Sequence, residues 1–224
     1  MKTAAILVGA GVSQRFGEDK IFRSWRGAPL LRWTMEPFLL SKSISTIILV
    51  LHADYLLLAE PFRNMPKVRA IVAGGTERQD SVRAGLSALD DEVRVLVHDV
   101  ARPCLTVELV ERLVDCLTHF PAVIPVWPVK ETVKSIEGNG RVKKTLLRKN
   151  LYWAQTPQAF QRVLLEEAHK NAVGRKENAP DDASLVEKLG VEVHAIPGDE
   201  ANIKVTTALD WILATKILEG KELS

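Results

Sequence analysis

Residues 3–20 read TAAILVGAGVSQRFGEDK, and this stretch gives the strongest indication of the fold. Residues 3–8 form a short, continuous apolar run, which is typical of a strand buried on both faces of a parallel sheet. Gly9, Ala10 and Gly11 follow at once, and small residues let the backbone approach a ligand closely and turn its N–H groups toward an anion. The stretch therefore predicts a first strand that leads into an anion-binding loop.

Strand-like and helical patterns alternate along the rest of the chain. Further apolar runs cover residues 46–51, 68–72, 93–97, 122–126 and 191–196, and helical patterns cover 29–40, 55–62, 77–89, 106–119, 161–171, 182–189 and 206–218. This alternation predicts parallel βαβ units, hence an α/β fold with a mostly parallel, twisted sheet and helices on both faces. We expect one domain over residues 1–224, with its ligands beyond the carboxyl ends of the strands.

Residues 128–152 interrupt the alternation. Two extended runs flank Asn139-Gly140, a pair that favours the tight turn of a β-hairpin. A hairpin with this much exposed, β-prone surface should pack against other protein surface rather than stand alone in water, so we favour an arm that packs on a second subunit. The alternative is a flap that lies on its own domain.

Composition limits the classes of partner. The chain has 224 residues and a net charge of +2, and its scattered Lys and Arg residues argue against nucleic acid. No apolar run approaches the ~20 residues of a membrane span, and no signal-peptide pattern is present. Cys104 and Cys116 lack a CxxC partner, which favours buried thiols in a reducing compartment. We therefore expect a cytoplasmic protein, not bound to membranes, that binds a phosphorylated metabolite.

The loop after the first strand also carries Arg15 and Lys20. Two cations there suit the charge that develops on oxygens during phosphoryl-type transfer. A Walker A loop is excluded because it ends in Gly-Lys-Ser/Thr, and a dinucleotide fingerprint is disfavoured because Gln14 stands where its third glycine belongs. For this loop alone, a glycine-rich turn with solvated charges stays open as the alternative.

Two further loops follow predicted strands. Gly75 and Ser81 belong to a double-glycine turn before a helix capped over 76–79, and they suit the edge of a nucleobase, with a plain strand–helix turn as the alternative. Asp99 ends a strand, where it suits a ribose hydroxyl or a divalent metal ion. Arg102 suits a substrate phosphate, and a structural Asp–Arg pair is the alternative.

Three positions later in the chain carry weaker signals. Thr156 precedes a proline that we expect in the first turn of a helix. The acids at 181–182 fit N-capping as well as function. Lys204 lies in a predicted short strand over 202–206, where a lone lysine is usually a solvated charge.

Together these motifs resemble the 2-C-methyl-D-erythritol 4-phosphate cytidylyltransferase family over nearly the whole chain. The resemblance lies in residues 9–20, 74–86, 97–103, 128–134, 151–160, 181–187 and 202–206. It implies a Rossmann-like nucleotidyltransferase fold and a homodimer joined through a protruding β-arm. It also implies a Mg²⁺-dependent reaction in which CTP and a polyol phosphate give a cytidine diphospho-alcohol and pyrophosphate.

The resemblance also implies site residues. Arg15 and Lys20 match cations that stabilise the transition state, and Arg148 and Lys204 match those that position the acceptor phosphate. The positions that match cytosine contacts are Ala10, Gly11, Gly75 and Ser81. Asp99 matches the ribose and metal position, while Arg102, Thr132 and Thr156 match acceptor-binding positions, with Thr132 and Arg148 reaching the neighbouring subunit's site.

The sequence departs from the family pattern at a few positions, namely Gly9, Ser13, Val100, Pro180 and the short segment before Lys20. Pro180 has no donor where a threonine often binds the acceptor. A cytidylyltransferase for ribitol 5-phosphate is therefore the nearest rival. A non-catalytic nucleotide-binding regulator is the rival of another class, and the cations and Asp99 speak against it.

Overall fold

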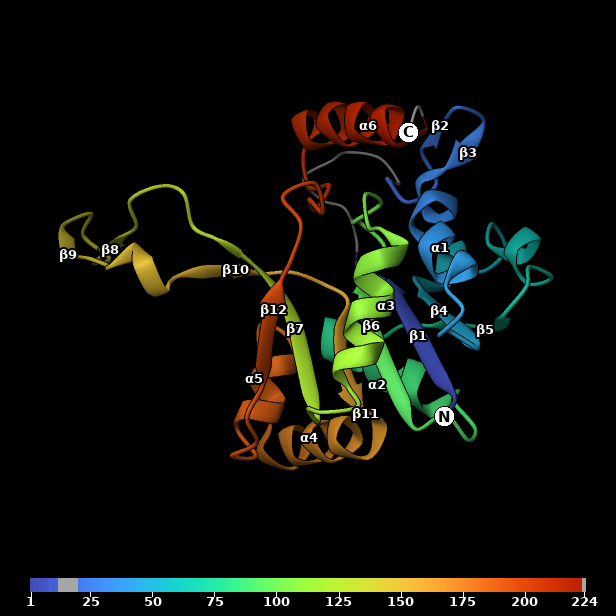
Figure 1. Ribbon diagram of the computed structural model, residues 1–224, viewed down its shortest axis with the longest axis horizontal. Coiled ribbons are helices and arrows are strands. Elements are labelled where there is room, and N and C mark those ends of the chain that lie inside the picture. The colour runs from blue at the N-terminus through green and yellow to red at the C-terminus, as the bar shows by residue number, and fades with distance from the viewer. Residues whose placement is uncertain (12–19, 223–224) are drawn as a thin grey trace.

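One eight-stranded sheet forms the centre of the protein in the computed structural model, which describes residues 1–11 and 20–222 (Figure 1). The strands are β1 (Thr3–Gly9), β2 (Ser24–Trp25), β3 (Ala28–Pro29), β4 (Thr46–Leu51), β5 (Val68–Ala73), β6 (Arg94–Asp99), β7 (Ala122–Pro128), β8 (Lys134–Ile136), β9 (Val142–Thr145), β10 (Tyr152–Ala154), β11 (Gln158–Gln161) and β12 (His194–Pro197). Strands β2 and β3 form a separate hairpin, as do β8 and β9.

The sheet is mostly parallel. Strand β1 pairs in parallel with β4 and β6, and β4 pairs in parallel with β5. Strands β10 and β11 run antiparallel along one edge of β7, and β12 runs parallel along its other edge. Strand β11 also pairs with β6 and so joins the two halves of the sheet. The predicted α/β class and mostly parallel sheet are confirmed.

Helices cover both faces of this sheet because β1 is apolar on both sides. Ala5 and Leu7 belong to one core cluster, whereas Ala4, Ile6 and Val8 belong to the other. The helices are α1 (Leu30–Leu40), α2 (Arg78–Ser87), α3 (Val107–Cys116), α4 (Arg162–Arg175), α5 (Asp182–Glu187) and α6 (Ala208–Glu222). The first cluster contains residues of α1 and α3, and the second contains residues of α2, α4 and α5. Among the described helices, none is long and apolar enough to cross a membrane.

Three local predictions are wrong. Residues 55–62 form no α-helix but two short 3₁₀ turns, η1 (Ala53–Tyr55) and η2 (Glu60–Phe62), because Pro61 lacks a backbone donor and disfavours a helical residue before it. Pro157 precedes strand β11 rather than opening a helix. Residues 202–206 form no strand, although Val205 donates its backbone N–H to Ala101.

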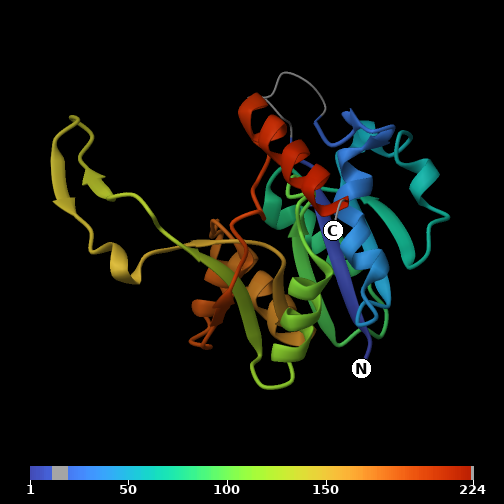
Figure 2. The ribbon, with the colours of Figure 1, turned by 45° about the horizontal axis from the view of Figure 1, so that its top comes forward.

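The predicted hairpin at 128–152 is present. Strands β8 and β9 pair antiparallel, and Gly140 has a φ of +85°, a backbone conformation that glycine adopts without a steric penalty. The segment extends away from the body in both ribbon views (Figures 1 and 2). A short 3₁₀ turn, η3 (Arg148–Asn150), precedes β10 on its return. We call residues 128–152 the arm.

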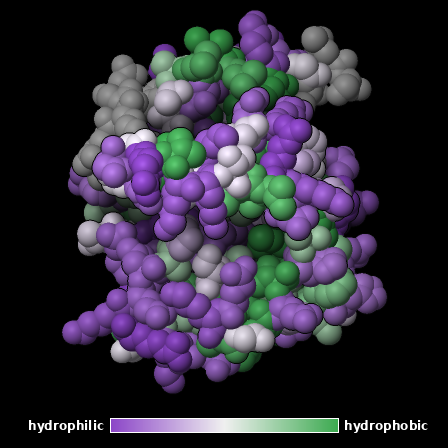
Figure 3. Space-filling view, turned by 90° about the vertical axis from the view of Figure 1, so that its left-hand side faces the viewer, coloured by the Kyte–Doolittle hydropathy of each residue, from purple (hydrophilic) through white to green (hydrophobic). Residues whose placement is uncertain are grey.

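The arm carries exposed hydrophobic side chains. These are Ile136, Val142, Leu147 and Tyr152, each more than half exposed, and Trp153 directly after the arm is exposed to a similar extent. The face from which the arm projects is mainly hydrophilic, with separate hydrophobic patches (Figure 3).

The two-sided core makes a stability prediction. Leu49, at the centre of β4, is fully buried, and its replacement by Ala should lower the free energy of unfolding by about 2–5 kcal/mol because a cavity remains. Leu57→Ala is the matched control: Leu57 is exposed, so its loss should change stability by less than about 0.5 kcal/mol. Urea unfolding followed by circular dichroism measures both, and equal midpoints would contradict the assignment of β4 to the core.

Candidate active site

A pocket of about 250 Å³ opens beyond the carboxyl ends of β1 and β6. Six of the predicted site residues line it: Gly11, Lys20, Gly75, Ser81, Asp99 and Lys204. They come from four separate loops, which the parallel strands bring to one edge of the sheet. Ala10 is buried beside this group, since a Cβ added to Gly74 would lie 2.3 Å from the Ala10 Cβ.

The double glycine lets two loops approach each other. A Cβ on Gly74 would also meet the Ser81 hydroxyl at 2.6 Å, and a Cβ on Gly75 would lie 2.3 Å from the Asp80 Cβ. Ser81 Oγ accepts from the Gly75 N–H at 3.2 Å and donates to the Glu77 carbonyl, so it holds the turn in place. The cap of α2 is Glu77, whose N–H donates to Asp80, and not the predicted 76–79 pattern.

Asp99 is the charged centre of the pocket wall. Its Oδ1 accepts from Arg78 Nε at 3.1 Å, and its Oδ2 accepts from Lys204 Nζ at 2.7 Å. The alternative from the sequence, a structural ion pair between Asp99 and Arg102, is wrong, since Arg102 Nη1 donates to the Asn202 carbonyl at 2.8 Å instead. Lys204 is not the lone solvated charge that its sequence context favours.

The ion pairs keep Asp99 ionised. Burial opposes ionisation, but the charges of Arg78 and Lys204 outweigh it and hold the pKa of the Asp99 carboxyl well below its usual range. Arg78 is partly buried, and the two carboxylates Asp182 and Asp99 raise the pKa of its guanidinium. The pocket therefore presents a fixed negative charge flanked by two fixed positive ones.

Thr156 and His98 support Asp99 from below. The Thr156 hydroxyl accepts from the Asp99 N–H at 3.1 Å and lies 2.9 Å from His98 Nδ1. His98 Nε2 lies 3.1 Å from the Arg102 carbonyl. These contacts are all satisfied when Nε2 carries the proton and the Thr156 hydroxyl donates to Nδ1. Burial lowers the pKa of His98 to about 4, so the ring is neutral near pH 7.

Asn202 ties the lysine segment to this support. It is fully buried, and its side-chain amide donates to the Thr156 carbonyl at 2.8 Å while its own carbonyl accepts from Arg102. Arg102 and Thr156 thus lie beneath the pocket and are not among the described residues that line it. They connect the segment at 202–206 to the end of β6.

The two acids at 181–182 have different roles. Asp181 caps α5 by accepting from the Ser184 N–H at 3.0 Å, which is the capping alternative of the sequence analysis. Asp182 is buried and instead accepts from Arg78 Nη1 at 2.6 Å and lies 2.9 Å from His169 Nε2. The charged group of the pocket therefore continues into the interior.

The remaining predicted residues lie elsewhere. Arg15 lies outside the described residues. Thr132 and Arg148 belong to the arm, where Arg148 donates to the Lys130 carbonyl. The arm projects away from the body that contains Asp99 (Figure 2).

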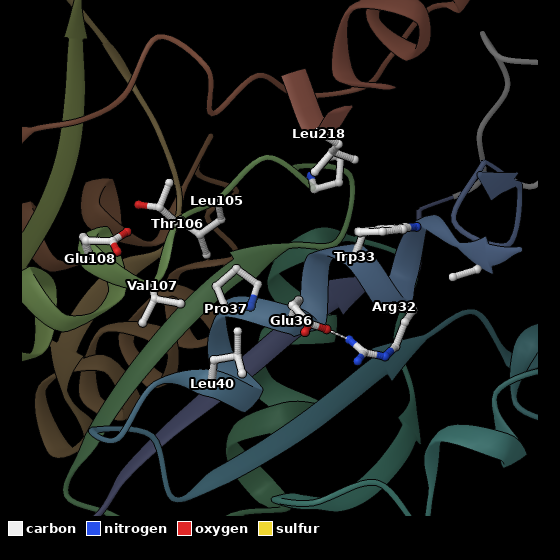
Figure 4. Close-up of a pocket in the computed structure, with 12 residues that line it drawn as sticks. Arg32, Trp33, Glu36, Pro37, Leu40, Leu105, Thr106, Val107, Glu108 and Leu218 are labelled. Carbon is white, nitrogen blue, oxygen red and sulfur yellow. Dashed lines mark hydrogen bonds and ion pairs between the residues drawn. The ribbon is translucent and has the colours of Figure 1, made fainter. Parts of the chain in front are cut away.

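Two larger hollows contain none of the predicted site residues. One, between α1, α3 and the end of α6, is mainly apolar, and its Arg32 and Glu36 pair with each other (Figure 4). The other lies where the base of the arm meets α6, beside Trp153. Six of the predicted site residues and the charged groups Asp99, Arg78 and Lys204 meet in the smaller pocket, so we take it as the candidate site.

A metal ion would have one carboxylate here. Among the described residues no group of three or more His, Cys, Asp or Glu side chains is placed to hold a metal. Asp99 is ionised and lines the pocket, and Mg²⁺ commonly binds one or two carboxylates plus the oxygens of a substrate's phosphates. The residues present therefore fit Mg²⁺ carried on a triphosphate.

Sequence reasoning missed Arg78 and His169, and it left the role of Asp182 open between N-capping and function. A signal for Arg78 was available: it stands at the first position of α2, where a cation is unfavourable beside the helix dipole unless a carboxylate compensates it. No local pattern indicated that Arg78 pairs with Asp99 and Asp182, which lie 21 and 104 positions away.

Comparison with known proteins adds an independent finding. The family model described as 2-C-methyl-D-erythritol 4-phosphate cytidylyltransferase matches residues 3–220. Relatives with that name from Syntrophus aciditrophicus and Dictyoglomus thermophilum are 39% and 40% identical, covering 99% of this chain and 97% and 99% of their own. The crystal structure of 4-diphosphocytidyl-2C-methyl-D-erythritol synthase from Anaerococcus prevotii is similar, with 31% identity, a TM-score of 0.87 and coverage of 97% and 96% of the two chains. The Thermus thermophilus 2-C-methyl-D-erythritol 4-phosphate cytidylyltransferase structure is 32% identical, with a TM-score of 0.82 over 98% and 100%.

Neutral His98 predicts acid sensitivity. Its pKa of about 4 in the folded state lies below the ~6.5 of an unfolded histidine, so the unfolded state binds more protons between these values. The resulting stability is fully present above pH 6.5 and is lost as pH falls toward 4, to a maximum of about 3 kcal/mol. Urea unfolding at pH 7.0, 5.5 and 4.5 measures it, and His98→Asn should show a shallower fall. Equal slopes in the two proteins would contradict this origin.

Proposed function

The chain belongs to the 2-C-methyl-D-erythritol 4-phosphate cytidylyltransferase family, and we propose that the pocket around Asp99 is its catalytic site. The enzyme is a nucleotidyltransferase of the EC 2.7.7 type. It transfers CMP from CTP to 2-C-methyl-D-erythritol 4-phosphate in isoprenoid precursor biosynthesis. The shared name of the relatives does not favour ribitol 5-phosphate as the acceptor.

One observation supports the site above all others. A glycine turn, an ionised carboxylate and two lysines, Lys20 and Lys204, meet at one pocket although they come from four loops. Backbone N–H groups near Gly75 suit a nucleobase edge, and Asp99 suits the ribose or a phosphate-bound cation. The lysines suit the phosphates, where charge develops during transfer.

The reaction is an in-line displacement at phosphorus. An oxygen of the acceptor phosphate forms a bond to the α-phosphorus of CTP, and the bond from that phosphorus to the bridging oxygen breaks. The electron pair leaves with pyrophosphate. The acceptor phosphate is already ionised near pH 7, so no general base is needed, and neutral His98 has a supporting role. Arg15 and Lys20 stabilise the charge of the transition state, and Arg148 and Lys204 orient the acceptor phosphate.

Lys204 changes partner in this scheme. It pairs with Asp99 here, and its side chain is 42% exposed, whereas that of Asp99 is 11% exposed. To hold the acceptor phosphate, the lysine swings away from the carboxylate. Asp99 Oδ2 then becomes available to the nucleotide. Asp99 would hold Mg²⁺, which when bound neutralises part of the triphosphate charge.

We further propose that residues 1–224 form one catalytic domain that works in the cytoplasm as a homodimer, with the arm at 128–152 on the second subunit. The exposed hydrophobic side chains of the arm support this interpretation. So does its direction, since Thr132 and Arg148 lie on a segment that extends away from their own body (Figure 1). The partner's site is where these two residues would bind the acceptor.

The lysine of the first loop gives a direct test. Lys20→Ala should lower kcat by about 100-fold or more because one stabilising cation of the transition state is lost, and Arg15→Ala should act similarly. Pyrophosphate release from CTP and 2-C-methyl-D-erythritol 4-phosphate measures the rate. Lys188→Ala removes an exposed lysine paired with Glu177 and should match the unmodified enzyme. Unchanged turnover in Lys20→Ala would refute the assigned role.

Subunit mixing tests the arm. Arg148→Ala should mainly raise the KM for the acceptor, and Lys204→Ala should also be defective. If the arm acts on the partner, a mixed dimer of the two variants has one fully intact site. Statistical exchange then restores about a quarter of normal activity. If the arm acts on its own domain, the mixture should show only the average of the two variants, and sedimentation as a monomer would equally reject the dimer.

A further inference from the structure

Arg78 bridges two buried carboxylates. Its Nε donates to Asp99 Oδ1 at 3.1 Å, and its Nη1 donates to Asp182 Oδ2 at 2.6 Å. The guanidinium is a rigid planar fork, so these two contacts fix both the position and the tilt of Asp99 relative to α5. Lysine at this position would have one charged nitrogen and no such fork.

Asp182 has no local reason to be buried as an acid. The cap of α5 is Asp181, and Asp182 makes no contribution to it. Its side chain is 1% exposed, and it is compensated by Arg78 on one side and contacted by His169 Nε2 on the other. Burial opposes its ionisation, but the charge of Arg78 and the contact with His169 hold the pKa of Asp182 below its usual value. An isolated carboxylate in this place would be strongly unfavourable.

The four charged groups form a series of contacts in which the sign alternates: Asp182 contacts Arg78, Arg78 contacts Asp99, and Asp99 contacts Lys204. Arg78 is less exposed than Lys204, at 27% against 42% of the side chain. When Lys204 leaves Asp99 for the acceptor phosphate, a step that rests on the proposed function, Arg78 is the cation that stays. Asp99 then keeps one compensating charge and one fixed oxygen while its other oxygen turns to the nucleotide.

We propose that Arg78 is a positioning residue for Asp99, and that Asp182, held by His169, anchors Arg78 in turn. The arrangement extends the site from the pocket into the α4–α5 side of the core. It predicts that Asp182, which is not among the described residues that line the pocket, affects the kinetics of the enzyme with CTP.

Asp182→Asn tests the anchor. The amide keeps the size and an acceptor oxygen but removes the charge, so Arg78 is held less firmly, and kcat/KM for CTP should fall about 10-fold. The KM for the acceptor should change little, because Asp182 acts on Asp99 and not on Lys204. Asp181→Asn is the matched control: it makes the same chemical change one residue away, keeps a good N-cap and should be near normal.

Arg78 variants decide the case if Asp182→Asn does not fold at the assay temperature. Arg78→Lys should retain more kcat/KM for CTP than Arg78→Gln because it keeps the charge. Where Asp182→Asn folds, the double variant Asp182→Asn with Arg78→Gln should lose no more than Arg78→Gln alone, since the acid acts through the arginine. Thermal unfolding of each variant confirms that folded protein is compared.

Several results would overturn the inference. They are normal kinetics for CTP in a folded Asp182→Asn, equal activity in Arg78→Lys and Arg78→Gln, or fully additive losses in the double variant. Asp99→Asn separates this failure from failure of the proposed function. If Asp99→Asn is inactive while Asp182→Asn is normal, only the anchor is wrong. If Asp99→Asn is fully active, the role of Asp99 itself is wrong.

Discussion

A buried carboxylate that stays ionised must have cations beside it, and Asp99 imposes this requirement on the whole site. Asp99 lies at the carboxyl end of strand β6, where burial alone would favour the neutral acid. Arg78, at the start of α2, and Lys204, in the segment at 202–206, supply the compensating charge. The positions of the double-glycine turn and of the segment at 202–206 bring these cations within reach of the Asp99 carboxylate.

The contacts that His98 makes below Asp99 are uncharged, and this contrast has a physical reason. His98 is fully buried and its ring nitrogens contact the Thr156 hydroxyl and the Arg102 carbonyl, so its neutral form is favoured and connects these two groups. A protonated imidazole in that position would be a further positive charge near the Asp99 carboxylate, and it would compete with Lys204 and Arg78 for the electrostatic interaction with that carboxylate. Asp99, Arg78 and Lys204 thus line the pocket, where phosphates would meet their charges, while His98 and Thr156 beneath Asp99 form uncharged hydrogen bonds.

The fold was largely predictable because a strand buried on both faces has a distinctive sequence. The continuous apolar runs located β1, β4, β5, β6 and β7 closely, and helical periodicity located most of the helices between them. The failures fall where burial gives little signal. Strands β10 and β11 are short and antiparallel, and they pair with β7 from a distant segment. The 3₁₀ turns at 53–62 have helical spacing but contain a proline.

The chemical groups and their order along the chain could be read from the amino-acid pattern: glycines after β1 and β5, Asp99 at the end of β6, and lysines at 20 and 204. That pattern also identified the edge of the sheet where they had to meet, because parallel strands end together. Which groups pair follows from the folded arrangement alone. Asp99 takes Arg78 and Lys204 rather than the nearby Arg102, and Asp182 pairs with Arg78 while its neighbour Asp181 caps a helix. Ion pairs depend on distance and burial, and the packing of α2, α5 and β6 determines both, over separations of up to 105 positions that no local pattern records.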